Sequence, residues 1–86
     1  MDANKTAAIF TAATTATNWK RTNLGLSTKV PVDGLDWTVR LPREGHGKAY
    51  IAGSSGWSGD SAEYIEATWS ETFAIVDAAL AATRLH

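Results

Sequence analysis

Helix-breaking residues are concentrated in the middle of this 86-residue chain. Both prolines, Pro31 and Pro42, and six of the seven glycines lie between residues 31 and 59. Proline removes a backbone donor and clashes with the preceding helical turn, and glycine lowers helix stability by about 1 kcal/mol relative to alanine. A long helix is therefore excluded from the middle of the chain. Any helices must lie on either side of it, in the segments with helical periodicity.

The first of these segments, residues 4–22, predicts a helix. Its apolar side chains fall within one broad sector at about 100° per residue, and threonines with Asn18 occupy the opposite side. The apolar set is Ile9, Phe10, Ala12, Ala13, Ala16 and Trp19. The glycine of Leu24-Gly25 is suited to end this helix with a left-handed cap.

Residues 37–52 predict a β-hairpin. Residues 37–41 alternate apolar and polar side chains, Pro42 ends the run, and a second run follows at residues 48–52. We expect residues 27–36 to be a connector, because Pro31 and Gly34 disfavour regular structure. The residues expected to face the core are Trp37, Val39, Leu41 and Ile51, and those expected to face outward are Thr38, Arg40, Lys48 and Tyr50.

The strongest helical periodicity lies near the C-terminus. Residues 60–63 resemble a capping box, with Asp60 as the cap and Glu63 three residues later, and we expect the helix to continue to about Arg84. Its apolar stripe, within about 80°, consists of Ile65, Trp69, Phe73, Val76 and Leu80. An alternative makes residues 62–68 a third strand and begins the helix at Ser70. We favour the continuous helix, since the stripe crosses that boundary.

These segments together predict a single α+β domain spanning residues 1–86. The expected order is helix, β-hairpin, helix, or the same order with a three-stranded antiparallel sheet. Both helices are expected on one face of this small sheet. A sheet of two or three strands leaves an open edge or face, which favours a binding module and makes a homodimer a further expectation.

The formal net charge of −1 conceals an uneven distribution. Residues 1–48 carry seven basic and four acidic side chains, a net charge of +3. Residues 49–86 carry one basic and five acidic side chains, a net charge of −4. The hairpin is therefore basic and the last helix acidic, and either face is a candidate recognition surface.

The residue types present limit the chemistry that the chain can carry. There is no cysteine, which excludes disulfides, thiolate metal sites and thiol nucleophiles. The two histidines, His46 and His86, have neither metal-ligand spacing nor an accompanying nucleophile. Gly53-Ser54-Ser55-Gly56 falls short of a nucleophile elbow, because Trp57 stands where the closing glycine is required. We expect a protein that is not an enzyme and holds no cofactor or metal ion.

The alternative with a third strand resembles a known family. Helix, three strands and helix is the order of the double-stranded-RNA-binding domain, and Glu44-Gly45-His46-Gly47-Lys48 lies where that family has its Gly-Pro-x-His loop. Ser70-Glu71-Thr72 stands where the family has a basic cluster. The resemblance implies a nucleic-acid-binding domain, and a basic face of the hairpin could contact phosphates and stack a base. The residues of that face are Arg40, Arg43, Lys48 and Tyr50.

Our leading expectation is a small non-enzymatic module that docks on a protein partner with a basic surface. It would act as an inhibitor or adaptor, as do many phage-encoded antagonists of host proteins. The expected contact residues are Glu63, Glu66, Ser70 and Asp77 on the acidic helix, together with Trp57. We expect a cytoplasmic location and no membrane partner, because no signal segment or membrane span is evident.

Overall fold

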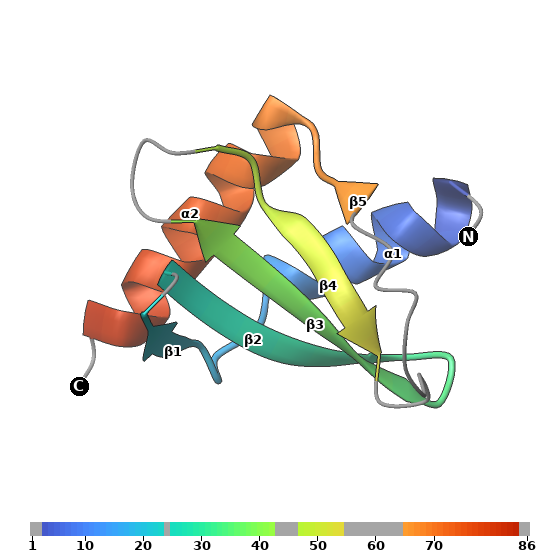
Figure 1. Cartoon of the computed structure of the whole chain (residues 1–86), viewed down its shortest axis with the longest axis horizontal. Coiled ribbons are helices and arrows are strands. Elements are labelled where there is room, and N and C mark those ends of the chain that lie inside the picture. The colour runs from blue at the N-terminus through green and yellow to red at the C-terminus, as the bar shows by residue number, and fades with distance from the viewer. Residues whose placement is uncertain (1–2, 24, 43–46, 55–64, 85–86) are drawn as a thin grey trace.

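The computed structural model describes residues 3–23, 25–42, 47–54 and 65–84 (Figure 1). In chain order the elements are α1 (Ala3–Ala13), β1 (Lys20–Thr22), β2 (Gly25–Val32), β3 (Leu35–Pro42), β4 (Tyr50–Ser54), β5 (Ile65–Glu66) and α2 (Trp69–Arg84). The predicted α+β class, with a helix before and after an antiparallel sheet, is confirmed. The sheet has five strands, however, rather than two or three.

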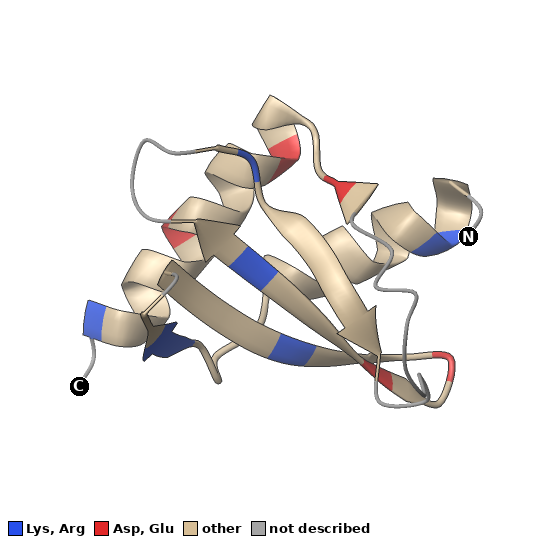
Figure 2. Ribbon diagram, in the orientation of Figure 1, with Lys and Arg blue, Asp and Glu red and all other residues tan. Residues whose placement is uncertain are grey.

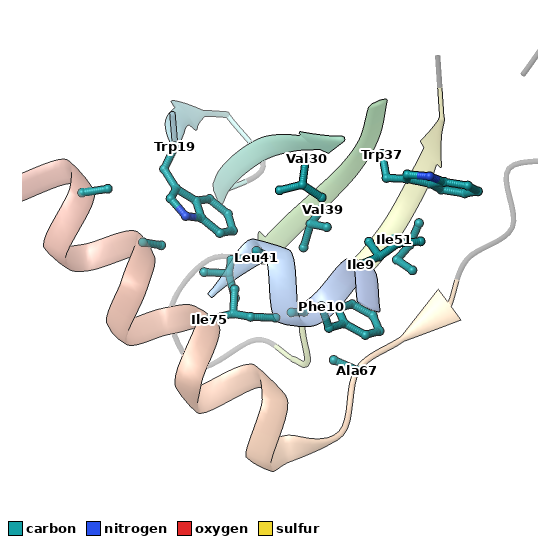
Figure 3. Packing of buried hydrophobic residues seen from close by; sticks show 14 residues of the cluster. Ile9, Phe10, Trp19, Val30, Trp37, Val39, Leu41, Ile51, Ala67 and Ile75 are labelled. Atoms are coloured by element: carbon teal, nitrogen blue, oxygen red, sulfur yellow. The ribbon is translucent and has the colours of Figure 1, made fainter. Parts of the chain in front are cut away.

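The five strands form an antiparallel sheet in the order in which they occur in the sequence. Both helices lie behind this sheet in the view of Figure 1, so they cover the same face, as expected. The opposite face carries no helix from the described residues. The result is two layers, with the apolar side chains between the helices and the sheet, as Figure 3 shows.

The segment predicted to be a connector, residues 27–36, is instead the β2–β3 hairpin. Val32 pairs with Leu35, and the two residues between them, Asp33 and Gly34, have positive φ values of 52° and 79°. Two consecutive positive φ angles make the tight turn whose twist matches that of the flanking strands. Pro31 is tolerated because β1 pairs only with residues 25–27, so this end of β2 has an open edge.

The predicted helix over residues 4–22 ends nine residues early, at Ala13. The reason lies in the threonines that follow. Thr14 and Thr15 donate their hydroxyls to the carbonyls of Thr11 and Ala12, at 2.6 Å and 3.1 Å. Hydroxyl bonds of this kind satisfy the last helical carbonyls, and β-branched side chains lower helix propensity, so the chain leaves the helix here.

The predicted continuous helix through residues 65–68 is also wrong, and the structure is nearer to the alternative: a strand lies within residues 62–68, at Ile65–Glu66, but it is the fifth strand and the helix begins at Trp69 rather than Ser70. Ile65 and Glu66 form β5 and pair with Ile51 and Tyr50. Residues 60–63, the predicted cap, lie outside the described ranges. Helix α2 begins at Trp69 with a different capping box: Thr68 N–H donates to Glu71 Oε1 at 2.9 Å, and Glu71 N–H donates to Thr68 Oγ1 at 3.1 Å.

The predicted core of the hairpin is confirmed. Trp37, Val39, Leu41 and Ile51 are all buried, and Val39 pairs with Ile51 across β3 and β4. From the helices, the core receives Ile9, Phe10 and Ala13 of α1 and Ile75, Ala79 and Ala82 of α2 (Figure 3). The longer described helix has 16 residues, and neither helix is long and apolar enough to cross a membrane.

Candidate functional site

Helix α2 has two apolar faces, and only one of them is buried. Its buried residues are Thr72, Ile75, Ala79 and Ala82. The apolar stripe predicted for this helix is largely exposed: Trp69 is 51% and Phe73 63% exposed, and Val76 and Leu80 are partly buried. The stripe therefore lies mostly outside the core, with Val76 packed against it. Small alanine side chains let α2 approach α1 and the sheet more closely than the two aromatic rings would allow.

The exposed stripe lines a groove between α2 and the first three strands, with a volume of about 560 Å³. Leu26 of β2 and Leu41 of β3 are register partners and form its sheet side. We call this feature the α2 groove. The residues that line it are Arg21, Thr22, Gly25, Leu26, Leu41, Pro42, Gly47, Trp69, Thr72, Phe73, Val76 and Leu80.

The two aromatic residues of the α2 groove are arranged by the helix and by a neighbouring lysine. Trp69 and Phe73 are one helical turn apart, and their ring centroids lie 6.0 Å apart at an interplanar angle of 28°. Lys48 Nζ lies 5.6 Å from the centroid of Trp69. Lys48 was expected on the outward face of the hairpin. It lies just before β4, and its ammonium group is attracted to the face of the indole ring instead.

The charged groups at the α2 groove are cationic. Arg21 is the charged residue among the described lining residues, and it is exposed beside its register partner Leu26. The ammonium of Lys48 lies at the Trp69 end. No carboxylate lines the groove within the described part of the chain. An apolar molecule with a negative charge therefore complements this groove.

The predicted acidic face does not lie on one helix. Glu66 is on β5, whereas Ser70 and Asp77 are exposed on α2, seven residues apart and thus on the same side. The physical reason is that the chain is extended, and not helical, at residues 65–66. Glu63 and Trp57 lie outside the described residues. Figure 2 shows acidic positions on both α2 and β5.

The predicted basic face is only partly assembled. Arg40 and Tyr50 are register partners on β3 and β4, while Lys48 contacts Trp69 and Arg43 lies outside the described residues. Lys20 and Lys29, on β1 and β2, join Arg40 on the sheet instead (Figure 2). The sheet also departs from the double-stranded-RNA-binding resemblance, because two additional strands, β1 and β2, precede the hairpin.

The residues that sequence reasoning assigned wrongly carried detectable signals. Thr68-Trp69-Ser70-Glu71 is a capping-box pattern directly before an apolar run, and it marks the start of α2. Asp33-Gly34 between alternating apolar residues is the strongest short hairpin signal, and it would have placed Lys29 on a strand. The wide apolar arc of α2 was a third signal, because a small sheet buries only part of it.

No group of three or more His, Cys, Asp or Glu residues within the described ranges could hold a metal ion. Comparisons of the chain with protein-family models, with curated protein sequences and with solved structures found no match.

Proposed function

We propose that this protein is a non-enzymatic protein-binding module, and that the α2 groove takes an amphipathic helical segment of a protein partner. The observation that carries the proposal is the exposure of two stacked aromatic rings, Trp69 at 51% and Phe73 at 63%, along an apolar groove. Contiguous exposed apolar surface of this kind is typical of an interaction site. The proposed docking surface is therefore the apolar stripe of α2 and not its acidic side, which the sequence favours.

The shape of the α2 groove supports a helical occupant. The stripe from Trp69 to Leu80 extends over about 16 Å, at 1.5 Å per residue, which corresponds to three turns of a partner helix. A helix docks in such a groove through apolar anchors at positions i, i+3 or i+4 and i+7. Arg21 and Lys48 favour aspartate or glutamate beside those anchors.

The energy available from the two rings is sufficient for a specific complex. An aromatic side chain buries roughly 150–250 Å², so a half-exposed ring leaves about 100 Å² to cover. At about 25 cal/mol per Å², covering each ring contributes roughly 2–3 kcal/mol. Trp69 and Phe73 are therefore the expected hot spots of the interface, in keeping with the enrichment of aromatic residues at such positions.

Selection from a phage-displayed library of random 16-residue peptides tests the proposal. We expect selected peptides to share apolar residues at helical spacing together with acidic residues. Phe73→Asp should weaken binding of a selected peptide by about 30-fold or more, which corresponds to about 2 kcal/mol. The matched control is Ala74→Asp, which adds the same charge at the adjacent exposed position, on another side of α2. This control should retain binding.

Two results would count against the proposal. If Phe73→Asp and Ala74→Asp bind the selected peptides equally well, the α2 groove is not the docking surface. If the wild-type protein is a dimer by light scattering and Phe73→Asp makes it monomeric, a second copy of this chain is the occupant. Near-UV circular dichroism verifies that both variants remain folded.

A further inference from the structure

The face of the sheet opposite the helices carries three cations close together. Side chains alternate between the two faces of a strand, and Thr28, Val30, Val39 and Leu41 are buried on the helix side. Lys29 and Arg40 must therefore lie on the open face, as does Lys20, the register partner of Ser27. Figure 2 shows these basic positions on adjacent strands. We call Lys20, Lys29 and Arg40 the basic face.

The register gives the spacing of the basic face. Lys20, Ser27, Arg40, Tyr50 and Glu66 form one row across all five strands. Lys29 stands two residues from Ser27 along β2. With strands about 4.8 Å apart and about 3.4 Å per residue, the Cα atoms of the three cations are roughly 8–10 Å from one another. Their long side chains can therefore reach neighbouring phosphates of one strand of nucleic acid.

Within the described residues, the three cations outnumber the carboxylates of the open face, Asp36 and Glu66. None of the three cations is in an ion pair with a described carboxylate. Asp36 is diagonal to Lys29, and Glu66 lies two strands from Arg40 in the same row, so both are roughly 8–10 Å from a cation. Three like charges within about one Debye length repel one another, so an anionic ligand that bridges them is favoured. Ser27 and Thr38, which lie between the three cations, have small side chains that do not protrude from the sheet.

Two further features near the three cations match the parts of a nucleotide. A hollow of about 140 Å³ lies among Lys20, Ser27 and Lys29 and is closed by Asn18 and Thr28, which are hydrogen-bonded to each other. A phosphate placed there would have an ammonium group on either side. Tyr50, half-buried beside Arg40, presents an aromatic ring on which a base can stack.

We infer that the open face of the sheet binds single-stranded nucleic acid, with phosphates on Lys20, Lys29 and Arg40 and a base on Tyr50. This surface is separate from the α2 groove, which lies on the helix side, and the inference goes beyond the proposed function. A single strand is favoured over a duplex because a stacked and paired base offers Tyr50 no open ring face. The module would then join a protein partner to a single strand.

Fluorescence anisotropy with labelled 20-nucleotide oligo-dT, measured from 20 to 200 mM salt, tests this inference. Three phosphate contacts predict a slope of log K against log salt of about −2, because each contact contributes about 0.7 on single strands. Lys29→Ala and Arg40→Ala should each reduce this slope by about 0.7 and weaken binding about fivefold at low salt. Tyr50→Leu should weaken binding about tenfold without changing the slope.

The matched control is Arg84→Ala, which removes one cation from the last turn of α2. It should change neither the slope nor the affinity. The inference is overturned if oligo-dT does not bind at 20 mM salt, or if Arg84→Ala weakens binding as much as Lys29→Ala does. Equal affinity for a 20-base-pair duplex would overturn the choice of a single strand. Phe73→Asp, which tests the α2 groove, should still bind oligo-dT. That result would distinguish the nucleic-acid site from the proposed protein-binding site.

Discussion

Two buried tryptophans differ in whether their indole N–H groups are hydrogen-bonded. Trp37 Nε1 donates to the carbonyl of Val32 at 3.2 Å, across the β2–β3 turn, and Lys5 Nζ lies 5.1 Å from the centroid of the Trp37 rings. Trp19 Nε1 is buried and has no hydrogen-bond partner among the described residues. A buried donor without a partner costs about 1–3 kcal/mol of folding free energy. The same substitution at the two positions should therefore have different effects.

We predict that Trp37→Phe lowers the free energy of unfolding by at least about 1 kcal/mol more than Trp19→Phe does. Both variants lose similar volume. Trp37→Phe also removes the indole hydrogen bond to the Val32 carbonyl, whereas Trp19→Phe removes an N–H with no described partner. Urea denaturation followed by circular dichroism measures the difference. A larger loss for Trp19→Phe would show that its N–H is bonded in solution.

The start of α2 depends on a local motif rather than on its apolar stripe. Thr68 and Glu71 satisfy each other's backbone N–H groups, and the buried Thr72 accepts the N–H of Ala49 through its hydroxyl, at 3.1 Å. The hydrogen bonds between Thr68 and Glu71 mark the start of α2, shortly after β5. The hydrogen bond from Ala49 to Thr72 joins the first turn of α2 to the segment that leads into β4. Sequence reasoning placed the boundary too early because the stripe continues through Ile65, which packs from a strand.

Thr68→Ala should lower the free energy of unfolding by about 1 kcal/mol, since it removes the N-cap acceptor of α2. Thr68→Ser should retain most of the stability, because serine offers the same hydroxyl. Ser70→Ala is the control within the same turn: Ser70 is exposed, and this change should stay within about 0.5 kcal/mol. Thermal denaturation compares the three variants. An equal loss in Thr68→Ala and Ser70→Ala would mean that α2 is not capped by Thr68.

The arrangement of the two layers decides which side of α2 is available to a partner. The apolar side chains of α2 cover about half of its circumference at about 100° per residue, which is more than the core receives. Ile75 is fully buried, whereas Phe73 is 63% exposed. The rotation of α2 about its axis therefore determines the location of the groove.

Alanine substitutions on the two sides of α2 show which side faces the core. Ile75→Ala should lower the free energy of unfolding by about 2–5 kcal/mol, as expected for a large side chain removed from a filled core. Phe73→Ala should cost less than about 1 kcal/mol, mainly through the lost stacking with Trp69. Denaturant unfolding of the two variants gives the comparison. If Phe73→Ala is the more destabilising, α2 is rotated with its stripe toward the core and no α2 groove exists.

Local sequence patterns were enough to predict the class of the fold, a helix near each end of the chain and the β3–β4 hairpin. These follow from local chemistry: the prolines and glycines between residues 31 and 59 exclude helix, and the alternation at residues 37–41 selects a half-buried strand. The turn at Asp33-Gly34 and the cap at Thr68 were equally local. Pro31 favoured a connector over a strand at residues 27–36. The apolar stripe favoured a helix that begins before Thr68.

Which residues share a surface depends on tertiary packing and strand pairing. A periodic pattern states that one side of α2 is apolar, but an arc of about half the helix can be buried in more than one rotation. The burial of Ile75 and Ala79 rather than Phe73 depends on how closely α2 approaches α1. Likewise, alternation along each strand shows that Lys29 lies opposite the buried residues of β2 and that Arg40 lies opposite those of β3. The pairing of β2 with β3 then places both side chains on the same face of the sheet. The candidate sites are products of packing and strand pairing, which no local window of sequence contains.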